Sequence, residues 1–308
     1  MRKEFAAWLE AYGARDERAV VLTGDLGFQA LEGVRSRLGP RFINAGVAEQ
    51  NMVSMAAALA SEGLRPFCYS IAPFAVFRPA EQIRLDVCVH NLDVKIVGNG
   101  GGYGYGIMGS THHALEDVAV LSSFQHMRCY LPVTGEDVAI VGDAMMAQVG
   151  PGYLRLNLGK LPPGYELGAY QPVRKLEVAG VSRAPRLTVL ALGPIVHNAL
   201  GPATASGLAE VFVVSEVPLP ELSAALLASV AATNQVLIVE EHVERGGLAE
   251  HVALMFLKRG LCPRIETRAA RGYPSGTYGS QKFHQQESAL DQGSLLNLID
   301  SLVEVAGG

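Results

Sequence analysis

RFINAGVAEQNMVSMAAALASEGLRPF, residues 41–67, is the stretch of sequence that decides the fold. It joins a short apolar strand to a turn of small residues and then to a helix expected over residues 47–62. Similar alternation surrounds it, with strands expected at residues 19–23 and 94–97 and a helix at residues 114–124. Strands that alternate with helices predict an α/β fold built on a parallel sheet.

The second half of the chain repeats this alternation after an interruption. Periodicity fades over residues 160–186, where prolines and glycines accumulate, as is typical of a link between domains. Beyond it LTVLALG, VFVVSE and QVLIVEEH are expected strands, and GGLAEHVALMFLKRG is an expected helix that ends at Gly260. With 308 residues, enough for two cores, we expect a parallel-sheet domain at residues 1–165 and a smaller α/β domain at residues 180–308.

Composition excludes several classes of function. The chain has 25 basic and 30 acidic residues, a net charge of -5 and no basic cluster, so it is not expected to bind nucleic acid or an anionic membrane. A hydrophobic fraction of 49% with 18% charged residues suggests apolar surface reserved for a partner. No apolar run is long enough for a membrane span and no signal peptide is visible.

The cysteines indicate a reducing compartment. They form no C-x-x-C pair, and each lies in an apolar or strand-like run, so all are expected to be buried free thiols: Cys68, Cys88, Cys129 and Cys262. We therefore expect a cytoplasmic protein.

Glu49 is the first candidate functional residue. It falls in the first turn of a helix that is apolar nearly all round, and such a helix is expected to be buried. A buried carboxylate must be paired, capping or protonated, because a lone buried charge is too costly. From the local pattern alone, a carboxylate that complements the helix N-terminus is the more frequent case.

A loop with seven glycines between Gly98 and Gly109 provides the next candidates, His112 and His113. The loop is expected to open a helix capped by Ser110 or Thr111. Gly104, Gly106 and Gly109 match the spacing of a dinucleotide-binding fingerprint. However, the preceding strand is expected to end at Val97, too early for that motif, and no acidic residue follows about 20 residues later to bind a ribose. The histidines are suited to hydrogen bonding or proton transfer, and no second ligand set supports a metal.

Arg155 lies in the alternating strand GYLRLNLG, on the same face as Tyr153 and Asn157. A guanidinium there is suited to a bidentate contact with phosphate. It is equally consistent with a charge on an edge strand.

Together these segments resemble the transketolase family, over about residues 24–291. Five marks in order carry the resemblance: RFINAGVAEQNM, YSIAPFAVFRPAEQIR, NLDVKIVG, GSTHHALED and VEEHVERGGLAEHVA. It implies a pyrimidine-binding domain followed by the family's C-terminal domain. In such enzymes the glutamate of the A-E-Q-N motif bonds the aminopyrimidine of thiamine diphosphate and promotes the tautomer that deprotonates the thiazolium carbon.

The resemblance assigns roles residue by residue. Glu49 is the activating carboxylate, and Phe74, or as second choice Phe77, stacks on the pyrimidine. His112 contacts substrate oxygens and moves protons, and Arg155 binds the phosphate of a sugar phosphate. Met108 replaces an acid usual in the family, three residues before the Thr-His pair, which puts the standard pentose-phosphate substrates in doubt.

The other half of the cofactor site is absent from the sequence. Diphosphate and Mg²⁺ are normally held by a G-D-G motif and a later asparagine. Gly24, Asp25 and Leu26 followed by Asn51 imitate that spacing, but Asn51 belongs to the helix of Glu49. The resemblance therefore implies a separate α-type subunit that holds diphosphate and Mg²⁺, in an α2β2 assembly.

The expected function is that of a β-type subunit of a split transketolase, which moves a two-carbon ketol unit from a ketose, or ketose phosphate, to an aldehyde. One alternative is the β subunit of a 2-oxoacid dehydrogenase or decarboxylase. Another, of a different class, is a non-catalytic nucleotide-binding subunit, which would rest on the glycine fingerprint at residues 104–109.

Overall fold

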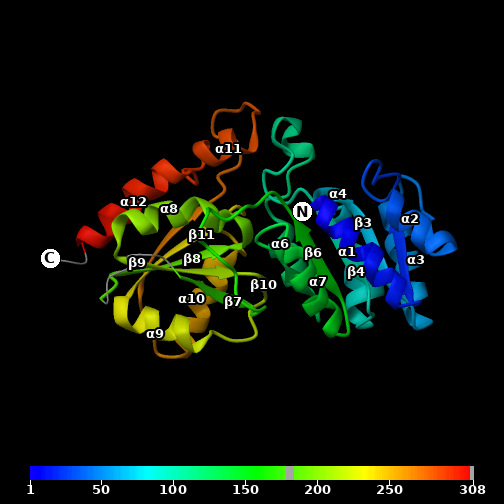
Figure 1. Cartoon of the computed structure of the whole chain (residues 1–308), viewed down its shortest axis with the longest axis horizontal. Coiled ribbons are helices and arrows are strands. Elements are labelled where there is room, and N and C mark those ends of the chain that lie inside the picture. Colours follow the sequence, from blue (N-terminus) through cyan, green and yellow to red (C-terminus); the bar gives the residue numbers. More distant parts are fainter. Residues whose placement is uncertain (178–183, 306–308) are drawn as a thin grey trace.

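Two α/β domains lie side by side in the computed structural model, which describes residues 1–177 and 184–305 (Figure 1). Each is built around one sheet. The first sheet has the strand order β10-β5-β6-β4-β3-β1-β2 and the second has the order β12-β11-β8-β9-β7. All neighbours are parallel except β10 with β5 and β7 with β9. The expected α/β architecture is confirmed.

The elements of the first domain follow the expected alternation. They are α1 (Arg2–Arg15), β1 (Ala19–Thr23), α2 (Glu32–Leu38), η1 (Gly39–Arg41), β2 (Phe42–Asn44), α3 (Glu49–Ser61), β3 (Arg65–Ile71), α4 (Ala72–Val76), α5 (Ala80–Gln82), η2 (Ile83–Val89), β4 (Lys95–Asn99), η3 (Gly106–Thr111), α6 (Asp117–Ser122), β5 (Arg128–Tyr130), α7 (Asp137–Ala147) and β6 (Gly152–Leu156). The helix expected at residues 47–62 is thus α3.

The second domain contains the remaining elements. They are β7 (Val173–Leu176), β8 (Leu187–Leu192), η4 (Gly193–Ile195), α8 (Val196–Ser206), β9 (Ala209–Val214), β10 (Glu216–Val217), α9 (Ala224–Thr233), β11 (Gln235–Glu240), α10 (Leu248–Lys258), β12 (Arg264–Ala269), α11 (Gln281–Glu287) and α12 (Gln292–Val305). Strand β10 crosses over to pair with β5 of the first sheet. The expected link at residues 160–186 contains β7, which already belongs to the second sheet.

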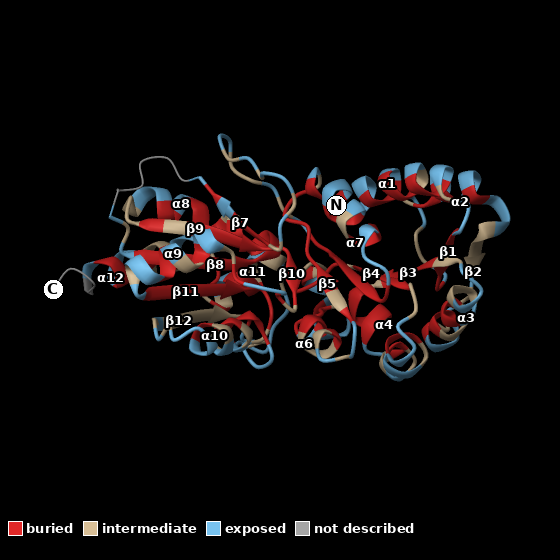
Figure 2. Ribbon diagram, turned by 90° about the horizontal axis from the view of Figure 1, so that it is seen from below, coloured by how far each residue is buried: buried red, intermediate tan, exposed pale blue. Residues whose placement is uncertain are grey.

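Both cores lie between a sheet and its covering helices (Figure 2). The central strands β1, β6, β8 and β11 are buried along their whole length, which explains their continuous apolar sequences. Helix α3 is less buried than its apolar sequence predicts. It buries Met52, Val53, Ala56 and Ala57, but its outer face of small and polar residues is exposed.

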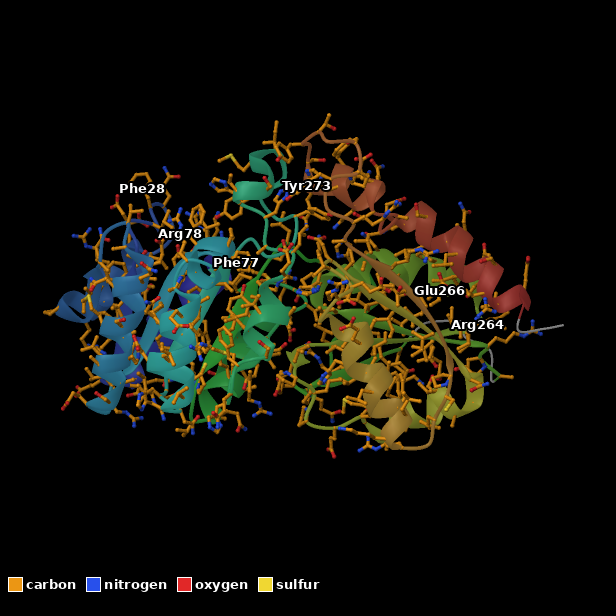
Figure 3. All side chains as sticks on the ribbon, turned by 180° about the vertical axis from the view of Figure 1, so that it is seen from behind. Phe28, Phe77, Arg78, Arg264, Glu266 and Tyr273 are labelled. Atoms are coloured by element: carbon orange, nitrogen blue, oxygen red, sulfur yellow. The ribbon has the colours of Figure 1, made fainter. Side chains whose placement is uncertain are left out.

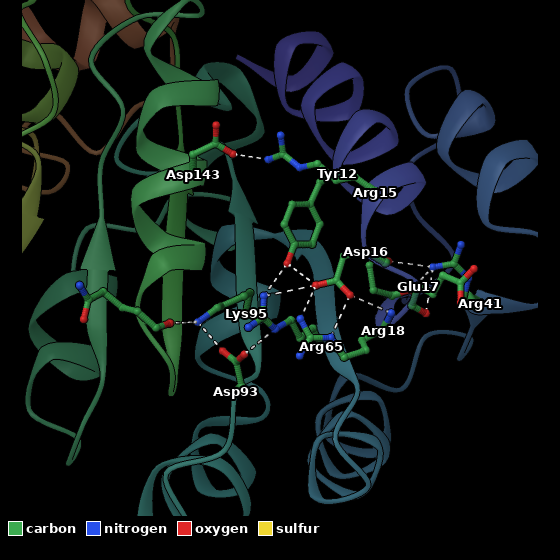
Figure 4. A network of polar contacts seen from close by, with 12 residues as sticks. Tyr12, Arg15, Asp16, Glu17, Arg18, Arg41, Arg65, Asp93, Lys95 and Asp143 are labelled. Carbon is green, nitrogen blue, oxygen red and sulfur yellow. Dashed lines mark hydrogen bonds and ion pairs between the residues drawn. The ribbon is translucent and has the colours of Figure 1, made fainter.

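A polar network closes the amino ends of the first sheet, opposite the loops described below (Figure 4). Lys95 is buried and pairs with Asp93 at 2.7 Å. Arg65 joins Asp93 to Asp16, and Asp16 also binds Arg18. The side-chain hydrogen bond from Arg18 holds the pKa of Asp16 well below its usual range. Because these contacts tie the starts of β3 and β4 to α1, they serve the fold rather than a site.

Two sequence expectations are wrong at the level of single residues. Cys262 is exposed, because it lies in the turn after α10 rather than in a strand, whereas Cys68, Cys88 and Cys129 are buried free thiols. Ser110 and Thr111 do not cap an α-helix. They end the short 3-10 helix η3, and α6 begins only at Asp117.

Within the described ranges, no helix has the length and apolar character that crossing a membrane requires.

Candidate active site

Glu49 is the first residue of α3, and its side chain is only 4% exposed. It does not cap its own helix. Instead its Oε1 accepts a hydrogen bond of 2.8 Å from Nη1 of Arg78, which follows α4. The preceding loop is close as well, because a Cβ on Gly24 would lie 3.8 Å from Oε1 of Glu49. Of the three states predicted for this carboxylate, the structure shows the paired one.

Phe74 joins Glu49 to the histidine loop. The guanidinium carbon of Arg78 lies 3.8 Å from the centre of the Phe74 ring, so one arginine contacts both the ring and the carboxylate. The ring of Phe74 also meets the ring of His112 edge to face, with 5.3 Å between the centroids. Three of the predicted site residues, Glu49, Phe74 and His112, are therefore brought together.

Phe77 lies outside this chain of contacts. It is 38% exposed and points from the same edge of the domain as Arg78 and Phe28, at the carboxyl ends of the strands (Figure 3). Beside Arg78 a cavity of about 450 Å³ is lined by Val47, Ala48, Glu49, Gln50 and Asn51. The geometry thus favours Phe74 over Phe77 as the ring nearest to the carboxylate.

The side chain of His112 is partly exposed and has a defined orientation. Its Nδ1 lies 2.9 Å from Oγ1 of Thr111, and that hydroxyl donates to the carbonyl of Met108 at 3.4 Å. A hydroxyl that donates to Met108 accepts from Nδ1–H, so Nε2 of neutral His112 keeps its lone pair. In the part of the chain that the structure describes, Nε2 of His112 has no hydrogen-bond partner. It is free to accept a proton or a hydrogen bond from a ligand.

His113 is a structural residue. It is buried, and its Nε2–H donates to the carbonyl of Gly106 at 2.8 Å while its Nδ1 accepts from the hydroxyl of Tyr273 at 2.9 Å. Burial lowers the pKa of His113 to about 4, which keeps the ring neutral and this pattern fixed at neutral pH.

Arg155 is not placed to bind a ligand. It is 2% exposed, and its Nε donates to Oδ2 of the buried Asp117 at 2.8 Å. Its Nη2 donates to the carbonyls of Ala114 and Glu241. The alternative of an edge-strand charge is wrong, because β6 lies between β5 and β4 inside the sheet. A buried cation needs an anionic partner, and Asp117 is that partner. Arg155 also links the end of the glycine loop to the second domain, because it donates to both Ala114 and Glu241.

The glycine fingerprint does not form a nucleotide-binding turn. Gly106 and Gly109 belong to η3, and the start of the loop is filled by protein, since Tyr103 donates its N–H to Glu241 and its hydroxyl to the carbonyl of Gly272. Asn51 contacts Met55 within α3, and Asp25 pairs with Asn44. Among residues 1–177 and 184–305, no group of three acidic, histidine or cysteine side chains is arranged to hold a metal.

Sequence reasoning missed two residues of the site, Arg78 and Tyr105. Arg78 follows Phe74 by four residues, a spacing that places side chains on one face of a helical turn and that predicts their stacking. Tyr105 lies beside His112, with 5.7 Å between ring centroids, and its hydroxyl accepts from Asn99. No local pattern marks Tyr105, because its position depends on the fold of the glycine loop.

Comparison with known proteins identifies relatives of this chain. Residues 1–163 match the family described as "Transketolase, pyrimidine binding domain". The chain is 30% identical over 270 residues to the B subunit of the apulose-4-phosphate transketolase of Actinobacillus succinogenes, a match that covers 85% of each chain. It is 34% identical over 310 residues to the 1-deoxy-D-xylulose-5-phosphate synthase of Myxococcus xanthus, a match that covers 99% of this chain but 52% of the relative.

A solved structure has the same fold over nearly the whole chain. It is described as "Split gene transketolase, inactive beta4 tetramer", with a TM-score of 0.81, 25% identity and 98% of both chains covered. The match therefore extends through both domains, and the name of the matched family implies use of thiamine diphosphate. On this combination of sequence match, fold and site geometry, the chain belongs to the transketolase family and comprises its pyrimidine-binding domain and C-terminal region.

Proposed function

We propose that this chain is the B-type subunit of a split, thiamine-diphosphate-dependent transketolase that moves a two-carbon ketol unit from a ketose to an aldehyde acceptor. The observation that carries the proposal is the cluster of Glu49, Phe74 and His112 at one edge of the first domain. The cluster combines a buried carboxylate, an aromatic face and an imidazole with a free nitrogen.

The residues present fit the aminopyrimidine end of the cofactor. Arg78 makes two contacts at once, a hydrogen bond to Glu49 and a stack on Phe74. A flat ring that bears an N–H donor would make the same two contacts, a hydrogen bond to Glu49 and a stack on Phe74. The adjoining cavity has a volume of about 450 Å³, which is within the range of small-ligand sites. Glu49 would hold the ring nitrogen, and Phe74 would hold the ring face.

The chain's own residues have distinct tasks in ketol transfer. When bound, thiamine diphosphate supplies the nucleophilic carbon. Glu49 provides the charge that favours the proton-accepting tautomer of the ring. His112 presents Nε2 as hydrogen-bond acceptor and proton carrier for a substrate hydroxyl, and the edge-to-face contact with Phe74 keeps it beside the cofactor position.

We assign no phosphate-binding role to Arg155. The family resemblance predicts that Arg155 binds the phosphate of a sugar phosphate, but the Arg155 side chain is buried against Asp117. The proposed donor is therefore a ketose, and the assay must include both free and phosphorylated ketoses.

The diphosphate and Mg²⁺ require a partner. Large apolar side chains are exposed around the site at the carboxyl ends of the strands, and clustered exposed apolar groups mark interfaces: Phe28, Val47, Phe77, Ile107 and Met108. The partner we propose is an A-type subunit with the diphosphate-binding domain, in an α2β2 assembly. The similarity to a protein named as the B subunit of a transketolase supports this arrangement.

The test is reconstitution. The chain is co-expressed with the product of the neighbouring reading frame, supplied with thiamine diphosphate and Mg²⁺, and screened with ketoses, ketose phosphates and pyruvate. We expect ketol transfer from a ketose that requires both chains. Release of carbon dioxide from pyruvate without ketol transfer would assign the chain to a 2-oxoacid decarboxylase instead, and full activity of the partner alone would contradict the proposal.

A further inference from the structure

Residues of the second domain hold the loop that carries His112. Figure 1 shows the loop before α11 and the segment η3 rising side by side above the two sheets. Tyr278 belongs to that loop of the second domain, and its hydroxyl lies 2.9 Å from Oγ of Ser110 at the end of η3. Tyr273, from the same loop, binds His113.

The ring of Tyr278 also fixes the backbone before His112. Gly109 has φ +71, and a Cβ there would lie 2.7 Å from the ring of Tyr278, so only glycine fits beneath it. The carbonyl of Gly109 accepts the backbone N–H groups of both His112, at 2.9 Å, and His113, at 3.1 Å. The contact of Tyr278 with Gly109 is therefore transmitted to the backbone of His112.

The opposite end of η3 is held separately. His113 donates to the carbonyl of Gly106 and accepts from Tyr273, so the second domain supports this end through two linked hydrogen bonds, of which the first is buried and the second partly buried. Gly106 itself packs against the backbone at Gly279 to Gln281, where an added Cβ would lie 3.1 to 3.3 Å from main-chain atoms. Two tyrosines of one loop thus support both ends of a six-residue segment.

We propose that Tyr278 is a positioning residue for His112, acting through Ser110 and Gly109. Its hydroxyl holds Ser110, and the neighbouring Thr111 then keeps Oγ1 between the carbonyl of Met108 and Nδ1 of His112. This arrangement places the proton on Nδ1 and leaves Nε2 as the acceptor. The inference rests on the proposed function for its catalytic consequence, but the tautomer of His112 is a property of the chain alone.

The first test needs no activity. The full chain is labelled with ¹⁵N-histidine, and the resonances of His112 are assigned by their loss in His112→Gln. In the wild type we expect ¹⁵N shifts of a ring protonated on Nδ1. Tyr278→Phe, which removes only the hydroxyl, should move His112 toward the mixture of tautomers of a free imidazole, and Ser110→Ala should do the same. Unchanged ¹⁵N shifts of His112 in Tyr278→Phe would overturn the proposal.

Tyr165→Phe is the matched control. The Tyr165 hydroxyl also contacts a hydroxyl, that of Thr204, but it lies away from η3. This variant should leave the His112 resonances as in the wild type. A change in Tyr165→Phe equal to that in Tyr278→Phe would mean that the shift reports a general loosening, which would also overturn the proposal.

The second test uses the reconstituted enzyme with its ketose donor. Loss of one neutral hydrogen bond corresponds to about a three- to ten-fold effect, and we expect it in kcat with little change in the KM of the ketose. The double variant Tyr278→Phe/Ser110→Ala should lose no more than either single variant, because both remove one interaction. Additive losses would contradict the coupling. Absence of ketol transfer in the wild type would contradict the proposed function but would leave the NMR result decisive.

Discussion

Nη1 of Arg78 lies 2.8 Å from Oε1 of Glu49, while the same guanidinium covers the face of Phe74. One side chain thus joins the carboxylate and the aromatic ring that the family resemblance assigns to the cofactor. The contact shows that the two groups are within reach of a single flat group. It also predicts how each residue of the pair responds to substitution.

Phe74 and Phe77 form a matched pair for the first prediction. Phe74→Ala removes the ring that contacts Arg78 and His112, and should weaken binding of thiamine diphosphate to the assembled enzyme about ten-fold. Phe77→Ala should change it less than about two-fold, because the ring lies outside these contacts. Calorimetric titration of both variants checks the order, and an equal or reversed effect would assign the stacking role to Phe77.

Removal of Arg78 should destabilise the free chain. Arg78→Met leaves the buried carboxylate of Glu49 without its partner, at a cost of about 1–2 kcal/mol, moderated by the exposure of the arginine. In the Glu49→Gln background the same substitution should cost less than about 0.5 kcal/mol, because no charge is left unpaired. Urea unfolding of the four proteins measures this coupling, and equal losses in both backgrounds would show that the pair contributes nothing.

Arg155 should act on stability and not on substrate affinity. Arg155→Met leaves the fully buried Asp117 without its cationic partner, with the hydrogen bond from the Tyr153 hydroxyl still in place, and should lower the free energy of unfolding by about 3 kcal/mol. Adding Asp117→Asn should restore part of this loss. A stable Arg155→Met protein whose KM rises only for phosphorylated ketoses would instead establish the phosphate-binding role that the buried position argues against.

The sequence predicts those parts of the site whose structure depends on residues that are close together in the chain. Strand β1, helix α3 and the place of Glu49 follow from hydrophobic periodicity and from one strand-turn-helix unit. The fold of the glycine loop depends on contacts across the domain boundary, such as those of Glu241 with Tyr103 and Asn157, and the partner of Arg155 is Asp117, a residue distant in the sequence. Such contacts leave no periodic trace in the sequence, which explains why the sequence predicts the start of an α-helix where η3 lies.

Glu240 predicts a pH dependence of stability. Burial raises its pKa to about 7 from 4.5, so the folded chain binds this proton more tightly than the unfolded chain. The contribution is fully present below pH 4.5 and is lost as the pH rises through 7, a change on the order of 3 kcal/mol.

Glu240→Gln removes this titration and keeps one carbonyl oxygen to accept the N–H of Leu248, while the loss of the second oxygen, which accepts from Ala249, lowers stability equally at every pH. The variant should therefore gain stability relative to the wild type as the pH rises from 5 to 8. Denaturant unfolding across that range measures the difference, and a constant difference would show that Glu240 does not titrate there.

The role of Glu49 is tested most directly by exchange of the proton on the thiazolium carbon of bound thiamine diphosphate. The assembled enzyme is mixed with D₂O, quenched in acid at short times and examined by ¹H NMR. A carboxylate that promotes the proton-accepting tautomer should make exchange fast in the wild type, and Glu49→Gln should slow it about 10²–10⁴-fold with assembly intact. Exchange at the wild-type rate in Glu49→Gln would contradict the account.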